Sequence, residues 1–150
     1  MPTCLTWSRW LETLRSKFGN KKVEFDGYKF DSLAEAKHYW WTLKPRLDAG
    51  EITHLEMQTA FQIEIKGKKI CKYKADFQYF DCKVIGPDGQ HGALVVEDVK
   101  GVRTAIYRLK KKLVEAQFVG TKIIEVPASK YRSVKYALPS VSTAALKKAN

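Results

Sequence analysis

Residues 94–101 read LVVEDVKG, an apolar run that ends in two acidic residues, a lysine and a glycine. Because side chains alternate between the two faces of a β-strand, we expect Asp98 and Lys100 to share one face and Glu97 to point to the other. A strand this rich in Leu and Val is typical of the centre of a sheet, where a carboxylate and an ammonium are costly to bury. The segment therefore indicates either charged groups kept for chemistry or a strand that exits into solvent, with Lys100 on the surface.

Two further acidic residues stand where they could assemble a metal site with Asp98. Glu35 lies in the first turn of an expected helix, and Asp76 lies in the expected strand segment YKADF at 73–77. Mg²⁺ prefers hard oxygen ligands and keeps several waters, so two or three carboxylates and a carbonyl group suffice to bind it. Beside this cluster, Lys100 could orient or deprotonate an attacking water molecule, because the pKa of a lysine falls readily on burial. These residue types match the hydrolysis of a phosphodiester bond.

The same positions also have structural explanations. Ser32 and Glu35 have the spacing of a capping box, in which the glutamate only bonds back to the start of its helix. Asp76 alternates with lysines and could lie on a solvated strand face. Glu97 is expected to be structural. The residues alone leave both interpretations of each acidic position open, and the case for a site depends on their joint occurrence.

Taken in order, these motifs resemble a small tailed-phage and prophage family of the PD-(D/E)XK nuclease superfamily. The motifs are FDS at 30–32 with Glu35 on a helix, YKADF at 73–77, and VEDVKG at 96–101. The similarity covers roughly residues 17–126, and Ala75 stands where the superfamily name has proline. A similar pattern occurs in the endonuclease I type of Holliday-junction resolvase, and the endonuclease subunit of heteromeric transposases shares the order.

The resemblance implies a restriction-endonuclease-like α/β fold, with a mixed central sheet flanked by helices. Asp76 and Asp98 would bind Mg²⁺ or Mn²⁺ with the Val99 carbonyl, Glu35 would complete the acidic cluster, and Lys100 would be the catalytic lysine. The implied function is a metal-dependent DNA endonuclease, selective for Holliday junctions or other branched DNA in phage recombination or DNA processing. The alternative is a non-catalytic DNA-binding accessory protein of recombination or packaging.

The chain is strongly basic, with a net charge of +11 from 27 Lys and Arg against 16 Asp and Glu. Such a balance suits a polyanionic partner, either nucleic acid or an acidic membrane surface. Two basic segments, a hairpin and the helix after Lys100, are expected to contact DNA, although each could be an ordinary solvated face. The expected DNA-binding residues are Lys66, Lys68, Lys69, Lys72, Lys74, Arg103, Arg108, Lys110 and Lys111.

The pattern of apolar residues predicts the elements that carry these groups. Asp26-Gly27 predicts a hairpin, and the next helix runs from Asp31 toward Gly50, with a kink or division at Pro45. Residues 52–65 and 70–80 are expected to form a long antiparallel pair, and residues 86–90 a turn. The strand that ends at Lys100, a helix at 104–119 and a strand at 122–126 then make a βαβ unit with parallel strands. We expect the inner face of that helix to carry Ile106, Leu109, Leu113 and Ala116.

The 150 residues fit one domain with a hydrophobic core. We divide them into an amphipathic helix at 1–16, a nuclease core at 17–127 and a basic tail at 128–150 that either folds onto the core or stays loose. A junction-cleaving enzyme is expected to be a homodimer, with the Trp7 and Trp10 stripe as one candidate contact. The chain contains no apolar run of about 18–20 residues and no signal-peptide core. We therefore expect a soluble cytoplasmic protein, in the host cytoplasm if it is phage-encoded, that does not bind membranes.

Overall fold

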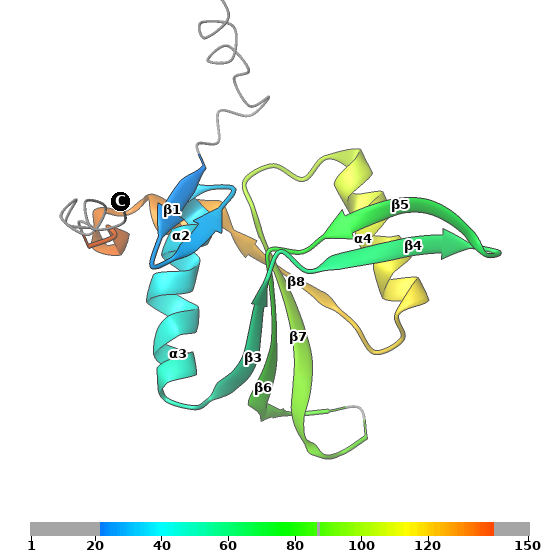
Figure 1. The fold of residues 1–150 in the computed structure, drawn as a ribbon, viewed down its shortest axis with the longest axis horizontal. Helices are drawn as coiled ribbons and strands as arrows, with labels where there is room; N and C mark the ends of the chain where they lie inside the picture. The colour runs from blue at the N-terminus through cyan, green and yellow to red at the C-terminus, as the bar shows by residue number, and fades with distance from the viewer. Residues whose placement is uncertain (1–21, 87, 140–150) are drawn as a thin grey trace, which may run out of the picture.

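A computed structural model describes residues 22–86 and 88–139 (Figure 1). It begins with a hairpin of β1 (Val23–Phe25) and β2 (Tyr28–Phe30). Asp26 and Gly27 both have positive φ, of 52° and 79°, which is the backbone conformation of a type I′ turn. This confirms the predicted hairpin. The helix predicted at 1–16, with its candidate dimer contact, lies outside the described residues.

The next helix continues through Pro45 by widening one turn. α2 (Leu33–His38), the π-helical turn η1 (Tyr39–Leu43) and α3 (Lys44–Asp48) follow one another without a break. Pro45 has no N–H to donate, and in an α-helix its ring meets the carbonyl four residues earlier. In the wider turn the Lys44 N–H donates to the Tyr39 carbonyl, five residues back. The chain therefore accommodates Pro45 without dividing the helix.

The long antiparallel pair is confirmed, and it is bent in the middle. β3 (Ile52–Met57) pairs with β6 (Phe77–Ile85), and β4 (Ala60–Ile65) pairs with β5 (Lys68–Lys74). Two backbone hydrogen bonds carry the pairing across the bend, from Gln58 N to Asp76 O and from Ala75 N to Thr59 O. Gln58 has a φ of 57°, so the first strand turns there. Asp76 thus lies at the bend, between two strands.

A mixed sheet forms the centre of the molecule, with strand order β3-β6-β7-β8. β7 (His91–Lys100) is antiparallel to β6 and parallel to β8 (Ile123–Pro127), and α4 (Ala105–Gln117) connects the two parallel strands. The predicted turn at 86–90 closes β6 and β7, with Gly86 N donating to Gln90 O. The predicted βαβ unit and the mixed α/β class are therefore confirmed.

Both faces of this sheet are covered, as Figure 1 shows. The helix α2–α3 packs on one face over Phe77, Tyr79 and Val95, and α4 with the β4–β5 hairpin packs on the other over Val96. β7 therefore runs through the core, and residues 95–99 are all buried.

The predicted inner face of α4 is wrong. Ile106 and Leu109 are exposed at 69% and 58%, Ala116 is also exposed, and Leu113 is half-buried. Tyr107 and Val114 are the buried residues of α4 instead. These two recur at helical spacing one position away from the predicted stripe, and the Tyr107 ring packs 6.3 Å from the ring of Tyr73 on β5. The Tyr107 ring is larger than the aliphatic side chains of the predicted stripe, and its burial sets the rotation of α4 about its axis.

The first part of the basic tail folds onto the core. It forms two 3₁₀ turns, η2 (Ala128–Arg132) and η3 (Val134–Tyr136), and Tyr131 is buried at 2% exposure among the residues that pack against α2. Cys71 and Cys82 are free thiols. Among the helices described, none is both long and apolar enough to cross a membrane.

Candidate active site

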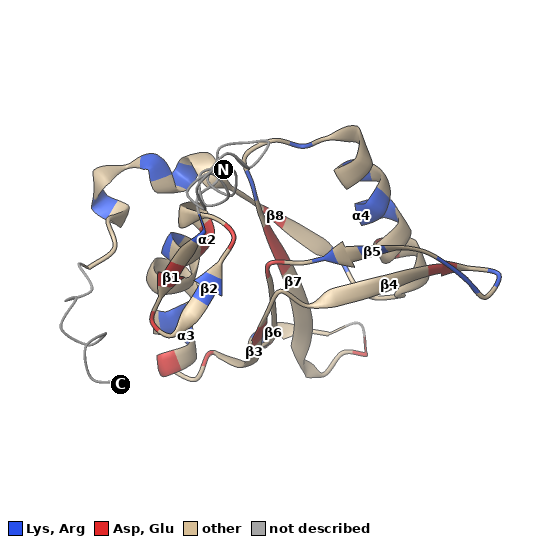
Figure 2. Ribbon diagram, turned by 45° about the horizontal axis from the view of Figure 1, so that its top comes forward, with Lys and Arg blue, Asp and Glu red and all other residues tan. Residues whose placement is uncertain are grey.

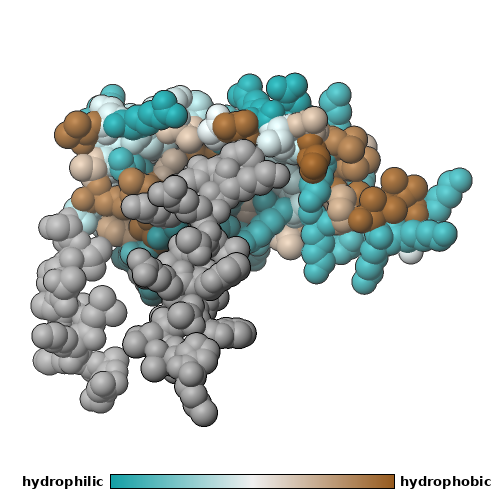
Figure 3. Space-filling view, turned by 90° about the horizontal axis from the view of Figure 1, so that it is seen from above, coloured by the Kyte–Doolittle hydropathy of each residue, from teal (hydrophilic) through white to brown (hydrophobic). Residues whose placement is uncertain are grey.

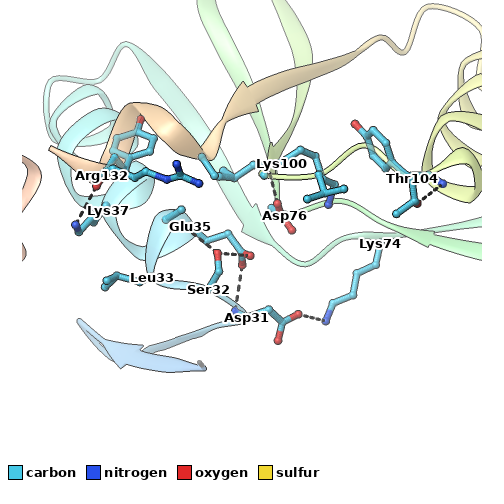
Figure 4. Close-up of a pocket in the computed structure, with 17 residues that line it drawn as sticks. Asp31, Ser32, Leu33, Glu35, Lys37, Lys74, Asp76, Lys100, Thr104 and Arg132 are labelled. Carbon is cyan, nitrogen blue, oxygen red and sulfur yellow. Dashed lines mark hydrogen bonds and ion pairs between the residues drawn. The ribbon is translucent and has the colours of Figure 1, made fainter. Parts of the chain in front are cut away.

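A pocket of about 1000 Å³ opens where α2 begins, β7 ends and η2 crosses between them (Figure 4). Glu35, Asp76 and Lys100 line it, together with Val99. Asp98 is fully buried and is ion-paired to Lys100. The structure therefore brings the predicted catalytic residues to one place, from a helix, a strand bend and a strand end.

Asp98 and Lys100 form the centre of the site. Lys100 Nζ lies 2.6 Å from Asp98 Oδ1, and the Tyr73 hydroxyl donates to the other oxygen of Asp98. The two side chains therefore share one face of β7, as predicted. Within the described residues, the buried Oδ1 has no hydrogen-bond partner besides this ion pair. Lys100 lines the pocket, whereas Asp98 is buried behind it.

The expected fall in the pKa of Lys100 is corrected. Burial does lower it, but the charges of Asp98, Asp76 and Glu35 together outweigh burial and hold the pKa above its ordinary value of 10.5. Lys100 is therefore an ammonium at neutral pH. It can orient a water molecule or stabilise negative charge, whereas deprotonation of water would require a neutral amine.

Asp76 is the carboxyl group of the site that holds a proton at neutral pH. Its Oδ2 accepts a hydrogen bond of 2.7 Å from Val99 N, which fixes the side chain against β7. Burial is the largest of the causes that raise the pKa of Asp76 to about 9; Asp98 and the charge of Glu35 also raise it, and Lys100 opposes the rise. Asp76 therefore keeps its proton at neutral pH, because one lysine does not balance the neighbouring carboxylates.

Glu35 forms the capping box with Ser32 that was one of the two explanations for its position in the sequence. Its Oε1 accepts from the Ser32 hydroxyl at 2.8 Å, its Oε2 accepts from Asp31 N at 3.1 Å, and its own N–H donates to Ser32. Burial raises the pKa of Glu35, although these hydrogen bonds oppose the rise. The capping role does not remove Glu35 from the pocket, and its charge still acts on Asp76 and Lys100.

Two of the acidic residues, Asp76 and Asp98, are placed so that they could bind a divalent cation together. Within the described residues, no group of three or more His, Cys, Asp or Glu side chains converges closely enough to hold a metal ion. Asp76 Oδ2 accepts from the N–H of Val99, the residue after Asp98, so the two aspartates are neighbours, and within the described residues the buried Asp98 Oδ1 has only Lys100 for a partner. Mg²⁺ is usually held in proteins by one or two carboxylates and keeps several waters. A two-carboxylate site is therefore compatible with this geometry, whereas Glu35 is engaged elsewhere.

Most of the predicted DNA-binding residues lie on the β4–β5 hairpin and on α4 (Figure 2). The hairpin projects from the body of the molecule, and Figure 3 shows hydrophilic side chains at its tip beside an apolar patch. Two apolar residues of the hairpin, Ile65 and Ile70, are half-exposed. The hairpin lysines that form no ion pair with any described residue are Lys66, Lys68, Lys69 and Lys72.

The remaining predicted DNA-binding residues differ in their surroundings. Arg103 and Lys111 are both paired with Glu125 on β8, so part of their charge is neutralised. Lys110 Nζ donates to the Lys72 carbonyl at 3.0 Å, which ties α4 to the hairpin. Arg108 is exposed on α4. Only one of the nine residues, Lys74, lines the pocket.

Three residues that line the pocket were not identified from the sequence. They are Lys37, Tyr131 and Arg132. Tyr131 and Arg132 come from the tail, and only their basic surroundings distinguished that segment. His38, on α2, is buried and joins three elements. Its Nε2 lies 2.6 Å from Glu97 Oε2 on β7, and its Nδ1 lies 2.6 Å from the Tyr131 hydroxyl on η2. Glu97 therefore has the structural position expected for it, on the face opposite Asp98.

Asp76→Asn is expected to stabilise the protein at alkaline pH. The pKa of Asp76 rises from 3.8 to about 9 on folding, so the folded chain holds a proton that the unfolded chain releases. The free energy of unfolding therefore falls as pH rises between these values, whereas asparagine stays neutral throughout. In EDTA at pH 8.5, we expect a melting temperature at least about 5 °C above wild type, since about 1 kcal/mol corresponds to roughly 2–4 °C. At pH 4 the difference should be small.

Asp48→Asn is the matched control for this measurement. Asp48 is exposed at the end of α3, so its variant should keep the pH dependence of wild type. If Asp76→Asn and wild type lost stability equally between pH 4 and pH 8.5, Asp76 would be ionised in the folded protein and the account of its surroundings would be wrong.

Comparison with known families gives one match. A family model described as "Protein of unknown function (DUF1064)" matches residues 15–137. No curated protein and no solved structure matches the chain. The matched range contains every residue that lines the pocket.

Proposed function

The chain belongs to the DUF1064 family, a family of unknown function, so its activity has to be inferred from its own site, and we propose that it is a metal-dependent DNA endonuclease. The observation that supports this most strongly is that Asp76, bonded to Val99 N, lies beside the buried Asp98 and the Lys100 ammonium at an open pocket. Two carboxyl groups forced together are costly without a counter-charge, and a divalent cation supplies one. The basic hairpin and α4 supply charge suited to a nucleic-acid backbone.

Asp76 and Asp98 would hold the Mg²⁺ or Mn²⁺ ion, with the Val99 carbonyl as a further ligand in the scheme that the resemblance implies. When bound, the ion supplies Lewis acidity and lowers the pKa of water. Asp76 would give up its proton on binding, because a cation replaces the proton as counter-charge. Lys100, which stays charged, would stabilise the negative charge that develops on the phosphate oxygens.

Hydrolysis adds water across one P–O bond of the backbone, so that a hydroxyl group joins phosphorus and a proton passes to the departing oxygen. Each residue at the site has a separate role in this reaction. Lys100 holds a positive charge beside the reacting phosphate, and Tyr73 fixes Asp98 through a hydrogen bond. Glu35 holds the start of α2 against the site and contributes negative charge to it. Branched DNA is the proposed substrate, and symmetric cleavage of a junction would require a homodimer.

A cleavage panel tests this proposal. Supercoiled, linear, nicked, flap, single-stranded and four-way-junction DNA should each be incubated with the full chain in Mg²⁺, Mn²⁺ or EDTA. We expect cleavage with either ion and none in EDTA, with branched substrates cut fastest. If every substrate remained intact with both ions, the nuclease proposal would be wrong. Tight DNA binding in the same samples would then favour the non-catalytic accessory role.

A further inference from the structure

Basic side chains stand on opposite rims of the pocket. Lys37 from α2 and Arg132 from η2 line one rim, and Lys74 from β5 lines the other. Figure 4 shows Asp76 and Lys100 between them, with Arg132 extending from η2 toward the pocket. The scissile position of the proposed function thus lies between two positively charged rims.

The Arg132 rim is held by buried contacts. The Tyr131 hydroxyl lies 2.6 Å from His38 Nδ1 and 2.9 Å from Thr42 Oγ1, and Lys37 Nζ donates to the Tyr131 carbonyl at 2.9 Å. Arg132 itself is exposed and forms no ion pair with the described part of the chain. A fixed backbone therefore presents an unpaired guanidinium to the pocket, and this group binds phosphate in a bidentate fashion.

Lys74, on the other rim, forms an ion pair with an acidic residue. Lys74 Nζ lies 3.4 Å from Asp31 Oδ2 across the mouth of the pocket, and both side chains are about half exposed. Exposed ion pairs of this kind are weak, so a phosphate group can replace Asp31 as the partner of Lys74. Asp31 then acts as a competitor for the ligand that Lys74 would bind.

We propose that one unpaired strand of nucleic acid crosses the pocket, with its phosphates held by Arg132 and Lys37 on one rim and by Lys74 on the other. This inference rests on the proposed function for the identity of the ligand. The pocket, at about 1000 Å³, has the size of a small-molecule site, and Asp76 and Lys100 line it. A few unpaired nucleotides fit such a space, whereas the full cross-section of a duplex does not. Selectivity for DNA with a flap or another unpaired segment follows, because such substrates offer a free strand.

Binding of a fluorescein-labelled oligothymidylate to the full chain, measured by anisotropy in EDTA, tests the strand path. Arg132→Gln should weaken binding about five- to tenfold and reduce the salt slope by about 0.7, as expected for one lost phosphate contact on a single strand. Lys130→Gln is the matched control, because Lys130 lies in the same turn, over the Tyr131 ring, and does not line the pocket. Its effect should stay within about twofold.

Asp31→Asn should have the opposite effect and tighten binding about threefold or more, because it frees Lys74 for phosphate. Asp48→Asn is its control, since Asp48 also forms an exposed pair with a lysine at 3.4 Å but lies away from the pocket. Equal weakening by Arg132→Gln and Lys130→Gln, or equal gains from the two aspartate variants, would overturn the strand path. Because EDTA prevents cleavage, a chain that cuts no DNA but shows these differences would refute the nuclease proposal and support the path.

Discussion

Asp98→Asn is expected to reduce DNA cleavage by at least about a thousandfold, because loss of a cation-binding carboxylate removes several kcal/mol of transition-state stabilisation. Asp98 is ion-paired with Lys100 and bonded to the Tyr73 hydroxyl, and it raises the pKa of Asp76, so it acts on each neighbouring group of the site. Asparagine keeps its shape and an oxygen for the Tyr73 hydroxyl. DNA binding in EDTA should be unchanged or tighter, since one negative charge is removed. Single-turnover cleavage and anisotropy on the same preparation separate the two effects.

Glu97→Gln, on the same strand, is the matched control for Asp98→Asn. Glu97 precedes Asp98, is buried like Asp98, and lies on the other face of β7, where it is bonded to His38 and Tyr79. This variant should lose stability but keep most of its cleavage rate at a temperature where it is folded. If the folded Glu97→Gln lost as much activity as Asp98→Asn, the effect would come from disruption of β7 and not from the chemistry of Asp98.

Lys100→Met is expected to lower the cleavage rate by at least about a hundredfold, the cost of losing one preorganised group that stabilises developing charge. The carboxylates hold the pKa of Lys100 above its ordinary value, so the wild-type rate should show no step from Lys100 between pH 6 and 9. Methionine keeps the length of the side chain and removes its charge. The pKa of Asp76 should rise further, because Lys100 is the group that lowers it.

Lys112→Met is the comparison for this second variant. Lys112 is exposed on α4 and does not line the pocket, so its loss should affect DNA affinity slightly and the rate at saturating DNA hardly at all. The role of Lys100 would be contradicted by a variant that binds DNA and Mn²⁺ and still cleaves at the wild-type rate.

The sequence predicted the parts of the fold that local rules determine. Asp26-Gly27 specifies a two-residue hairpin turn, and the strand–helix–strand order specifies parallel β7 and β8. The period of a strand alone placed Asp98 and Lys100 on one face and Glu97 on the other. These predictions needed no knowledge of which elements meet in space.

Other features depend on tertiary contacts and were missed. The face of α4 depends on which apolar side chains find partners, and Tyr107 packs on Tyr73, 34 residues earlier in the chain. The pKa of Lys100 depends on three carboxylates from three elements, so burial alone gave the wrong direction. Arg132 reaches the pocket because the preceding residue, Tyr131, is bonded to the helix through His38, Thr42 and Lys37. No spacing within the sequence encodes such a contact.

The central claim is that Asp76 and Asp98 together bind a divalent cation. Crystals soaked in Mn²⁺ and measured at the manganese absorption edge test it directly. We expect an anomalous peak about 2.1–2.2 Å from a carboxylate oxygen of each residue, and no peak in Asp98→Asn crystals treated in the same way. A well-ordered pocket without density between the two carboxylates, or a peak that persists in Asp98→Asn, would contradict the claim.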